Sequence, residues 1–304
     1  MCEELVKGLD FNRDTPYPTE KNTKWTILIP SKNRLDKEIT YNKMAAAGII
    51  DRVPTYLVVE PQEYEEAKAK GFNCVSLDKN DQGILYARNW ILRYAEENKL
   101  EHVCVMDDDI GDIGIIDPDG QTNIPGEYRR YYKDSKGNKK YYIEFLLETA
   151  EKLDGMASIP MALFAHETYK KILKTEPSGI DMFASFYQVM LYNMKYMPKG
   201  FQIRDDGTNE DIMQLMQLFL EHDVKFYRIY KYVFVAPKCG SNSGGMSSPN
   251  IVNNKYDHWH ENAIKLYGDY IKPEKKTVYG FRINTPKLTK LMKERFCKNI
   301  LDLI

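Results

Sequence analysis

The chain has 304 residues, a hydrophobic fraction of 43%, a charged fraction of 29% and a formal net charge of -1 at pH 7. A chain of this length and composition can form one large α/β domain or two smaller ones. The near-zero net charge excludes an overall basic field of the kind that binds nucleic acid nonspecifically, although it is compatible with a local basic patch.

The sequence carries no sign of export or of membrane insertion. The first residues are charged and lack an apolar core, so we expect no secretory signal, and no apolar run approaches the roughly 18 residues of a membrane helix. The five cysteines are scattered without a CxxC pair, which argues against a disulfide framework and against a cysteine zinc site. We therefore expect a cytoplasmic protein.

Strands and helices alternate in the first part of the chain. We expect strands at residues 25–30, where Pro30 ends an apolar run, and at 55–64, 73–78 and 102–109, with helices at 35–48, 63–71 and 82–99. Four strands with short helical connections predict right-handed βαβ units and a mostly parallel sheet.

The second part is less regular. We expect a loop or hairpin at residues 117–142 and a strand near the end of the sheet within 181–197. Helices are expected at 143–154 and 209–223, strands at 155–166 and 224–237, and a loop at 240–248. The rest has a helical pattern apart from a strand-like run at 277–283.

Three aspartates directly follow the apolar residues of the fourth strand. Asp107, Asp108 and Asp109 would lie at the carboxyl end of that strand, the edge at which open α/β sheets bind ligands. Adjacent carboxylates repel one another, so a cation should lie nearby, and oxygen ligands suit Mg²⁺ or Mn²⁺. In an extended chain Asp107 and Asp109 point to one side and Asp108 to the other. A solvated acidic turn is the alternative, and the preceding apolar strand argues against it.

The order of these motifs resembles the GT-A glycosyltransferase fold. The motifs are IPSKNR after the first strand, an acid after the second, ARN on a helix, and an apolar strand that runs into DxD. More narrowly, IPSKNR, QGILYARN and VMDDDI together resemble the TET-associated glycosyltransferases of phages. The resemblance implies a GT-A-like, Rossmann-type mixed sheet, mostly parallel and flanked by helices.

The resemblance also implies an activity. Such an enzyme moves a sugar from a nucleotide-sugar donor, here expected to be a UDP-sugar, with Mn²⁺ or Mg²⁺ as cofactor. Its acceptor would be the hydroxyl of a hydroxymethylated pyrimidine in DNA, such as 5-hydroxymethylcytosine. A phage-encoded enzyme of this kind would act in the host cytoplasm.

The resemblance assigns residues to the donor. Asp107 and Asp109 match the DxD carboxylates that hold the metal against the diphosphate, and Asp108 lies between them. In this fold the loop after the first strand commonly lines the base and ribose of the donor, and the acid after the second strand commonly contacts them. The loop residues here are Pro30, Ser31, Lys32, Asn33 and Arg34, and the acid is Glu60. Arg88 could approach the diphosphate or the aspartates, with a structural ion pair as the alternative.

Two further matches concern catalysis and the metal. Asn209, Glu210 and Asp211 fit the acidic xED motif at the start of a helix facing the acceptor, where Asp211 would be the general base of an inverting enzyme. Acids in the first turn of a helix are also favourable without any catalytic role. His258 or His260 would be a third metal ligand, and a structural histidine is the alternative.

Two loops have an open interpretation. The glycine- and serine-rich run at 240–248 could close over the diphosphate or serve as a linker. The basic and tyrosine-rich segment 128–142 could contact a DNA backbone and stack on a base, or form a solvated hairpin.

The resemblance divides the chain into three parts. We expect an irregular lead-in at residues 1–23, one catalytic domain at 24–270, and a C-terminal extension at 271–304 that packs on the domain. Within the domain, residues 24–116 would bind the nucleotide sugar and 117–270 the acceptor. The alternatives are a GT-A enzyme with a glycan, lipid or protein acceptor, a nucleotidyltransferase, and a non-catalytic binding module. A nucleotidyltransferase would be expected to have a glycine-rich phosphate loop early in the chain, and the sequence has none there.

Overall fold

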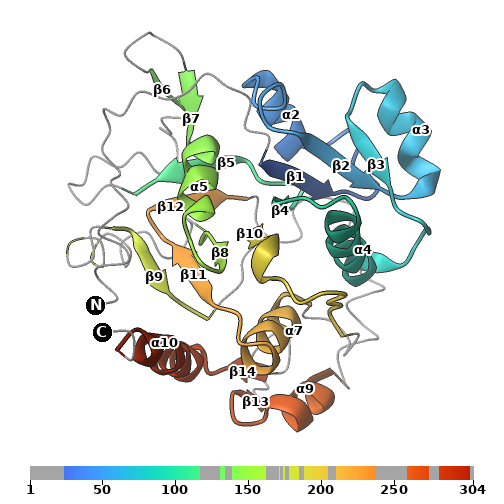
Figure 1. Ribbon diagram of the computed structural model, residues 1–304. Coiled ribbons are helices and arrows are strands. Elements are labelled where there is room, and N and C mark those ends of the chain that lie inside the picture. Colours follow the sequence, from blue (N-terminus) through green and yellow to red (C-terminus); the bar gives the residue numbers. More distant parts are fainter. Residues whose placement is uncertain are drawn as a thin grey trace.

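Figure 1 shows the computed structural model of the chain. The structure describes residues 24–116, 131–133, 139–161, 171, 174, 178–184, 188–204, 210–236, 259–273 and 281–301. It describes the backbone alone for residues 131–133, 139–140, 259–262, 273, 281 and 297–301.

Eight strands of the described chain form the central sheet, in the order β3-β2-β1-β4-β10-β8-β11-β9 (Figure 1). Their bounds are β1 Trp25–Pro30, β2 Thr55–Val59, β3 Cys74–Ser76, β4 His102–Met106, β8 Met156–Ser158, β9 Ile180–Met182, β10 Val189–Asn193 and β11 Phe226–Ile229. The four strands β3, β2, β1 and β4 are parallel to one another, as expected. β10 is antiparallel to both β4 and β8, and β11 is parallel to β8 and antiparallel to β9.

Helices cover both faces of this sheet. Three of them pack on one core with the first face: α2 Thr40–Ala46, α3 Pro61–Ala69 and α5 Tyr142–Glu151. Four pack on the second core with the other face: α4 Gly83–Glu97, α7 Glu210–Met216, α9 Trp259–Tyr267 and α10 Thr285–Leu301. Figure 1 shows α4, α7, α9 and α10 following one another around this second face.

Three small sheets and two short helices complete the described structure. The small sheets pair β5 Asp112–Ile115 with β12 Tyr232–Val235, β6 Tyr131–Lys133 with β7 Lys139–Tyr141, and β13 Ile271–Pro273 with β14 Phe281–Ile283. The 3₁₀ turn η1 spans Met194–Tyr196, and the π-helical turn η2 continues α7 over Gln217–Glu221.

The central strands β1, β4 and β10 are buried along their whole length and mostly apolar, since both of their sides are covered. In β1, Ile27 and Ile29 enter the first core while Leu28 enters the second. In β4, Cys104 enters the first core and Val105 the second. Continuous apolar runs of this kind are typical of parallel strands between two helical layers.

Two expectations for the second half are wrong in part. The run 181–197 contains two strands, and the longer one, β10, lies in the middle of the sheet beside β4 rather than near its end. The run 224–237 turns at Tyr230 and Lys231, so β12 leaves the central sheet and pairs with β5. Side-chain alternation shows that a segment is extended but does not identify its partner.

The start of α2 also differs from the expected one. The helix begins at Thr40 rather than at residue 35. The Glu38 carboxylate accepts hydrogen bonds from the backbone N–H groups of Tyr41, at 2.7 Å, and Asn42, at 2.9 Å. These bonds satisfy donors that the first helical turn leaves free, so the segment before Thr40 stays available as a loop.

No helix among the described residues combines the length and the apolar character needed to cross a bilayer. Of the described cysteines, Cys74 and Cys104 are free thiols.

Candidate active site

The candidate site lies where the strand order of the sheet reverses. From β1 the chain moves outward to β2 and β3, and it then returns to β4 on the other side of β1. In open α/β sheets the carboxyl ends of the strands at such a point form the ligand-binding crevice. The loop after β1, residues 31–34, therefore meets the turn after β4, residues 107–110.

The side chain and the backbone carbonyl of Asp108 connect these two segments. Its side chain is buried; Ser31 donates its hydroxyl to Oδ2 at 2.8 Å, and the Arg34 guanidinium pairs with Oδ1. Its backbone carbonyl accepts hydrogen bonds from the N–H groups of Ile39, at 3.1 Å, and Thr40, at 3.2 Å. Since both carboxylate oxygens have protein partners, Asp108 holds the site in shape.

The chain turns after Met106 instead of staying extended, so the alternation expected for the aspartates does not hold. Asp108 and Asp109 both approach Arg34, whose Nη1 lies 3.5 Å from Oδ2 of Asp109. Thr40 fixes the turn, because its hydroxyl donates to the carbonyl of Asp107 at 2.6 Å and accepts from the N–H of Ile110 at 2.8 Å. No pattern in the sequence indicates this role of Thr40.

Arg88 joins Asp107 to the start of α7. Its side chain is buried on α4, with Nη2 at 3.7 Å from Oδ1 of Asp107 and Nη1 at 3.2 Å from Oε1 of Glu210. Asp211 follows Glu210 in the first turn of α7 and is half-buried, and its Oδ1 accepts the N–H of Ile212 at 2.8 Å. The structure thus brings Asp107, Arg88 and the two acids of α7 into one cluster.

This cluster holds more negative charge than the protein neutralises. Burial raises the pKa of Asp107 to about 7; Arg88 opposes the rise, and Asp109, Asp108 and Glu210 add to it. Burial and Asp108 raise the pKa of Asp109, and burial and Asp211 raise that of Glu210. In the part of the site that the structure describes, two arginines face five carboxylates, so an additional cation would be stabilised here.

Asp109 has an oxygen atom suited to such a cation. Its Oδ1 is buried and has no hydrogen-bond partner within the described structure. A buried carboxylate oxygen without a partner is costly unless a cation or donor satisfies it. Asp107 and Asp109 therefore fit a hard divalent cation that completes its shell with water and phosphate oxygens.

The histidine predicted as the third ligand of the cation is not among the described side chains. His258 lies outside the described residues, and the side chain of His260 is not among those described. Among the described side chains, no three His, Cys, Asp or Glu residues are arranged to hold a metal ion. Asn209, residues 240–248 and most of segment 128–142 also lie outside the described structure.

The loop after β1 is organised by Glu60 at the end of β2. Glu60 is buried and accepts hydrogen bonds from Lys32 Nζ at 2.8 Å, Gln62 Nε2 at 2.7 Å and the backbone N–H of Asp81 at 2.9 Å. Lys32 Nζ also contacts Asp81 Oδ1 at 2.5 Å. The predicted donor residues Lys32 and Glu60 therefore lie together, and Asp81 joins them although the sequence did not single it out.

Asn33 occupies the sharpest point of this loop. Its φ of 56° lies in the left-handed region, which asparagine tolerates better than most residues, and its N–H donates to Oε1 of Glu63 at 2.8 Å. Pro30 ends β1 just before it, and Ser31 and Arg34 flank the aspartates. Residues 30–34 thus form a fixed wall beside the acidic cluster.

The family model of the TET-Associated Glycosyltransferase matches residues 25–245, which is most of the chain. The protein belongs to this family of glycosyltransferases. Its mixed, mostly parallel sheet flanked by helices confirms the GT-A-like fold class expected from the sequence. No curated protein shows a significant match to the chain.

Solved structures with a similar fold include the mannosyltransferase PcManGT from Pyrobaculum calidifontis in complex with GDP-Man and Mn²⁺. It shares 13% identity at a TM-score of 0.48, over 97% of this chain and 76% of that one. Glucosyl-3-phosphoglycerate synthase from Mycobacterium tuberculosis, in complex with Mn²⁺, UDP-glucose and phosphoglyceric acid, shares 9% identity at a TM-score of 0.42. That match covers 71% of this chain and 72% of the synthase.

Proposed function

We propose that the protein transfers a sugar from a UDP-sugar to the hydroxymethyl group of a 5-hydroxymethylpyrimidine in DNA, with Mn²⁺ or Mg²⁺ at Asp107 and Asp109. The observation that carries the proposal is the acidic cluster at the switch point of the sheet. Among the described residues, the buried Oδ1 of Asp109 has no partner, and it lies beside a loop that can line a nucleotide. The family assignment supports the DNA acceptor, because TET-type oxidation produces hydroxymethylated bases.

The residues of the loop after β1 bind and orient the donor. Lys32, held by Glu60, would face the base and ribose, and Pro30, Ser31, Asn33 and Arg34 form the wall on which they rest. Arg34 and Arg88 place positive charge on either side of the aspartates. A divalent cation bound at Asp107 and Asp109 would neutralise the charge that develops on the diphosphate as it leaves.

Asp211 would take the proton from the acceptor. The acceptor oxygen forms a bond to the anomeric carbon of the sugar, the bond from that carbon to the diphosphate oxygen breaks, and the carboxylate of Asp211 receives the hydroxyl proton. The products are the glycosylated base and a nucleoside diphosphate. Glu210, held at 3.2 Å by Arg88, positions the first turn of α7 for this step. His258 or His260 would complete the metal site.

The test uses the purified chain, a panel of UDP- and GDP-sugars with Mn²⁺, and two oligonucleotide duplexes. The duplexes differ only in whether one cytosine carries the 5-hydroxymethyl group. We expect release of UDP and a gain of one hexose mass on the hydroxymethylated duplex alone. The variant Asp109→Ala should lose both signals, and Asp269→Asn, a change at an exposed carboxylate in the turn after α9, should keep them.

Each other outcome revises a defined part of the proposal. Release of nucleoside diphosphate without mass gain on DNA would overturn the DNA acceptor and leave the donor site in place. Transfer from a GDP-sugar would overturn the UDP assignment. Undiminished transfer by Asp109→Ala would overturn the metal site.

A further inference from the structure

The C-terminal extension, residues 271–304, carries a charge opposite in sign to that of the rest of the chain. It contains nine lysines and arginines but three aspartates and glutamates, a formal charge of +6, whereas residues 1–270 carry -7. The near-zero net charge of the chain is therefore the sum of two segments of opposite charge. Such an asymmetry is typical of a segment that binds a polyanion.

Two of these cations lie opposite each other in the small sheet of β13 and β14. Lys272 is in register with Arg282, and both side chains are exposed. The neighbouring pair, Ile271 with Ile283, packs on the second core, so Lys272 and Arg282 point to the other, solvent side. Like charges directly opposite each other in a sheet are destabilising. Neither cation has an ion-pair partner in the described part of the chain, so a bound anion would relieve their repulsion.

The helix that follows β14 adds three cations on its exposed face. Lys287, Lys290 and Lys293 recur every three residues along α10, a spacing that places them on one side of the helix. Two of them have an acidic neighbour, since Lys287 lies 4.0 Å from Asp269 and Lys290 lies 3.9 Å from Glu294. Exposed pairs at such distances contribute little, so these lysines can still pair with an external anion.

The start of α10 is fixed beside the small sheet. Lys287 donates to the carbonyl of Asp269 at 3.1 Å and lies 4.9 Å from the ring of Tyr270, just before β13. The N–H of Asn284, just after β14, donates to the carbonyl of Tyr270 at 2.7 Å. Figure 1 shows β13, β14 and α10 together at the lower end of the molecule. We call the set of exposed cations on these elements the basic surface; they are Lys272, Arg282, Lys287, Lys290 and Lys293.

The apolar side of α10 is occupied by the fold. Leu288 and Met292 are fully buried and Phe296 is largely buried, all of them in the second core. A helix that lies on a membrane buries an apolar face in the lipid, and no such face remains among the described side chains of α10. The basic surface therefore fits a hydrophilic polyanion, a phosphodiester backbone, better than it fits a lipid surface.

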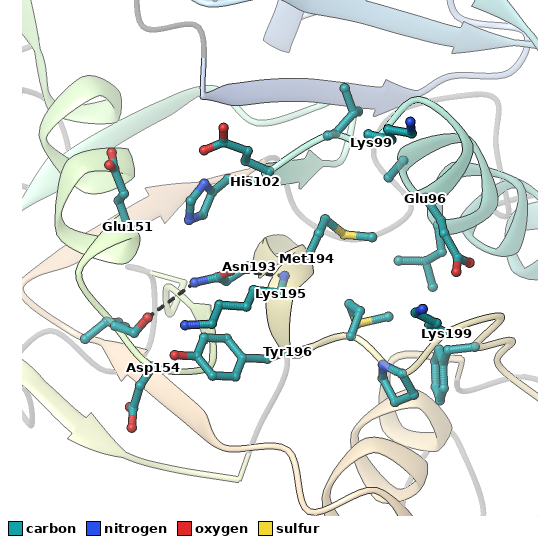
Figure 2. Close-up of a pocket in the computed structure, with 18 of the residues that line it drawn as sticks. Glu96, Lys99, His102, Glu151, Asp154, Asn193, Met194, Lys195, Tyr196 and Lys199 are labelled. Carbon is teal, nitrogen blue, oxygen red and sulfur yellow. Dashed lines mark hydrogen bonds between the residues drawn. The ribbon is translucent and has the colours of Figure 1, made fainter.

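The lysines at the other end of the sheet differ from the basic surface. Figure 2 shows Lys99, Lys195 and Lys199 around a cavity of about 770 Å³ at the edge where β4 and β8 begin. The carboxylates of Glu96 and Asp154 lie at the same cavity. Charges of both signs are mixed there, as on most protein surfaces, so these lysines provide a matched control.

The basic surface lies on the same side of the central sheet as the predicted general base. Phe296 of α10 packs on Phe219 of η2, with ring centroids 6.2 Å apart. Phe219 lies nine residues after Glu210 on the continuous helix of α7 and η2, which is about 14 Å along its axis. A duplex rises about 3.4 Å per base pair, so a short duplex on the basic surface is long enough to reach the start of α7.

We propose that the basic surface binds the phosphodiester backbone of double-stranded DNA. The four ammonium groups and the guanidinium of Arg282 would contact phosphate oxygens without reading the bases. The inference rests on the proposed function, because it assigns a docking surface to the DNA acceptor. Binding and sugar transfer are measured separately, so that the failure of one is distinguished from the failure of the other.

The test measures the binding of a short unmodified DNA duplex by fluorescence anisotropy, with neither donor nor divalent cation present. The variant Lys272→Gln/Arg282→Gln/Lys290→Gln removes three exposed cations of the basic surface. It should bind at least about tenfold more weakly at about 0.1 M salt, and the slope of log Kobs against log salt should become flatter by about three.

Two further variants serve as controls. Lys99→Gln/Lys195→Gln/Lys199→Gln has the same net charge as the first variant and should keep the affinity and the salt slope of the wild type. Lys272→Arg/Arg282→Lys/Lys290→Arg retains the charge of the basic surface and should also bind as the wild type does.

The proposal would be overturned if the wild type did not bind the duplex, if the two glutamine variants bound equally, or if the charge-conserving variant lost binding. Binding to vesicles that contain phosphatidylserine, without binding to the duplex, would assign the basic surface to a membrane instead. A chain that binds the duplex through this surface but transfers no sugar would contradict the proposed function alone. An unchanged KM for the hydroxymethylated duplex in the first variant would contradict the docking surface alone.

Discussion

The carboxylates at the two edges of the central sheet differ in their ion-pair partners. The amino edge is the one where β4 and β8 begin, and the carboxyl edge is the one where β1 and β4 end. At the amino edge, Asp154 and Glu151 each have a lysine partner supplied by the fold. At the carboxyl edge, five acids from the turn after β4 and from α7 share two arginines, Arg34 and Arg88. One oxygen of Asp109 there has no partner within the described residues.

This difference separates structural charge from functional charge. A paired acid at the amino edge lowers the free energy of the folded state. An acid in the crowded cluster raises it until a ligand arrives, which is the electrostatic arrangement expected of a site that binds a cation. The variants below change charges at one edge at a time, so the sign of each effect tests the comparison.

The largest effect is expected for Arg88→Met. The variant leaves Asp107 and Glu210 buried without their cation, and breaking a buried ion pair on one side costs about 3–5 kcal/mol. Urea unfolding of the variant and the wild type measures this loss. Arg93→Met, on the same helix but exposed and paired with Asp78, should cost less than about 1 kcal/mol.

A triple variant distinguishes lost charge balance from lost packing. Arg88→Met combined with Asp107→Asn and Glu210→Gln removes the uncompensated charges and should recover most of the free energy of unfolding. A single Arg88→Met variant as stable as the wild type would contradict the idea that this arginine balances the cluster.

The next effect is on turnover. Asp211→Asn should lower kcat by roughly 10²–10⁴, the usual contribution of a general base, with little change in the KM for the donor. Steady-state kinetics at saturating hydroxymethylated DNA separate the two constants. If kcat stays within a factor of two of the wild type, another group removes the acceptor proton.

The sequence predicted those parts of the molecule that depend on local pattern. The apolar runs before Pro30 and Asp107 located β1 and β4, and the parallel order followed from the alternation with helices. The contact between Arg88 and Glu210 was not predicted, because it depends on long-range pairing. Arg88 meets Glu210 only because β10 enters the sheet beside β4 and brings α7 over its end.

The same limit applies within single segments. From the sequence, Asp107 to Asp109 were expected to be extended. They form a turn instead, which the hydroxyl of Thr40 stabilises. From the sequence, His102 was expected to be an ordinary strand residue, whereas both of its ring nitrogens are buried without a hydrogen-bond partner among the described residues.

At the amino edge, Asp154→Asn should lower stability. Burial raises the pKa of Asp154, but hydrogen bonds from Lys225 and Tyr227 outweigh burial and hold that pKa below its ordinary value of 3.8. We expect a loss of about 1 kcal/mol at pH 7, reduced for the partial exposure of the pair. Urea unfolding checks this value.

The pH dependence of that loss has a defined sign. A carboxylate whose pKa is depressed in the folded state stabilises the protein fully above the unfolded-state pKa, and the stabilisation disappears as the pH falls through the folded-state pKa. The difference between the wild type and Asp154→Asn should therefore be constant from pH 7 to 5 and shrink below pH 3.8. A difference that does not change with pH would show that packing, not charge, holds Asp154.

The smallest effect tests the comparison most directly, because the same chemical change should have the opposite sign at the other edge. Asp109→Asn removes a carboxylate that burial and Asp108 destabilise, and it should raise the free energy of unfolding by on the order of 0.5 kcal/mol. Thermal unfolding with and without Mn²⁺ gives a second signature. The metal should raise the Tm of the wild type and leave that of the variant nearly unchanged, because only the wild type has the full ligand set. If Asp109→Asn destabilises the protein as Asp154→Asn does, the charge at the carboxyl edge is structural too, and the distinction between the two edges fails.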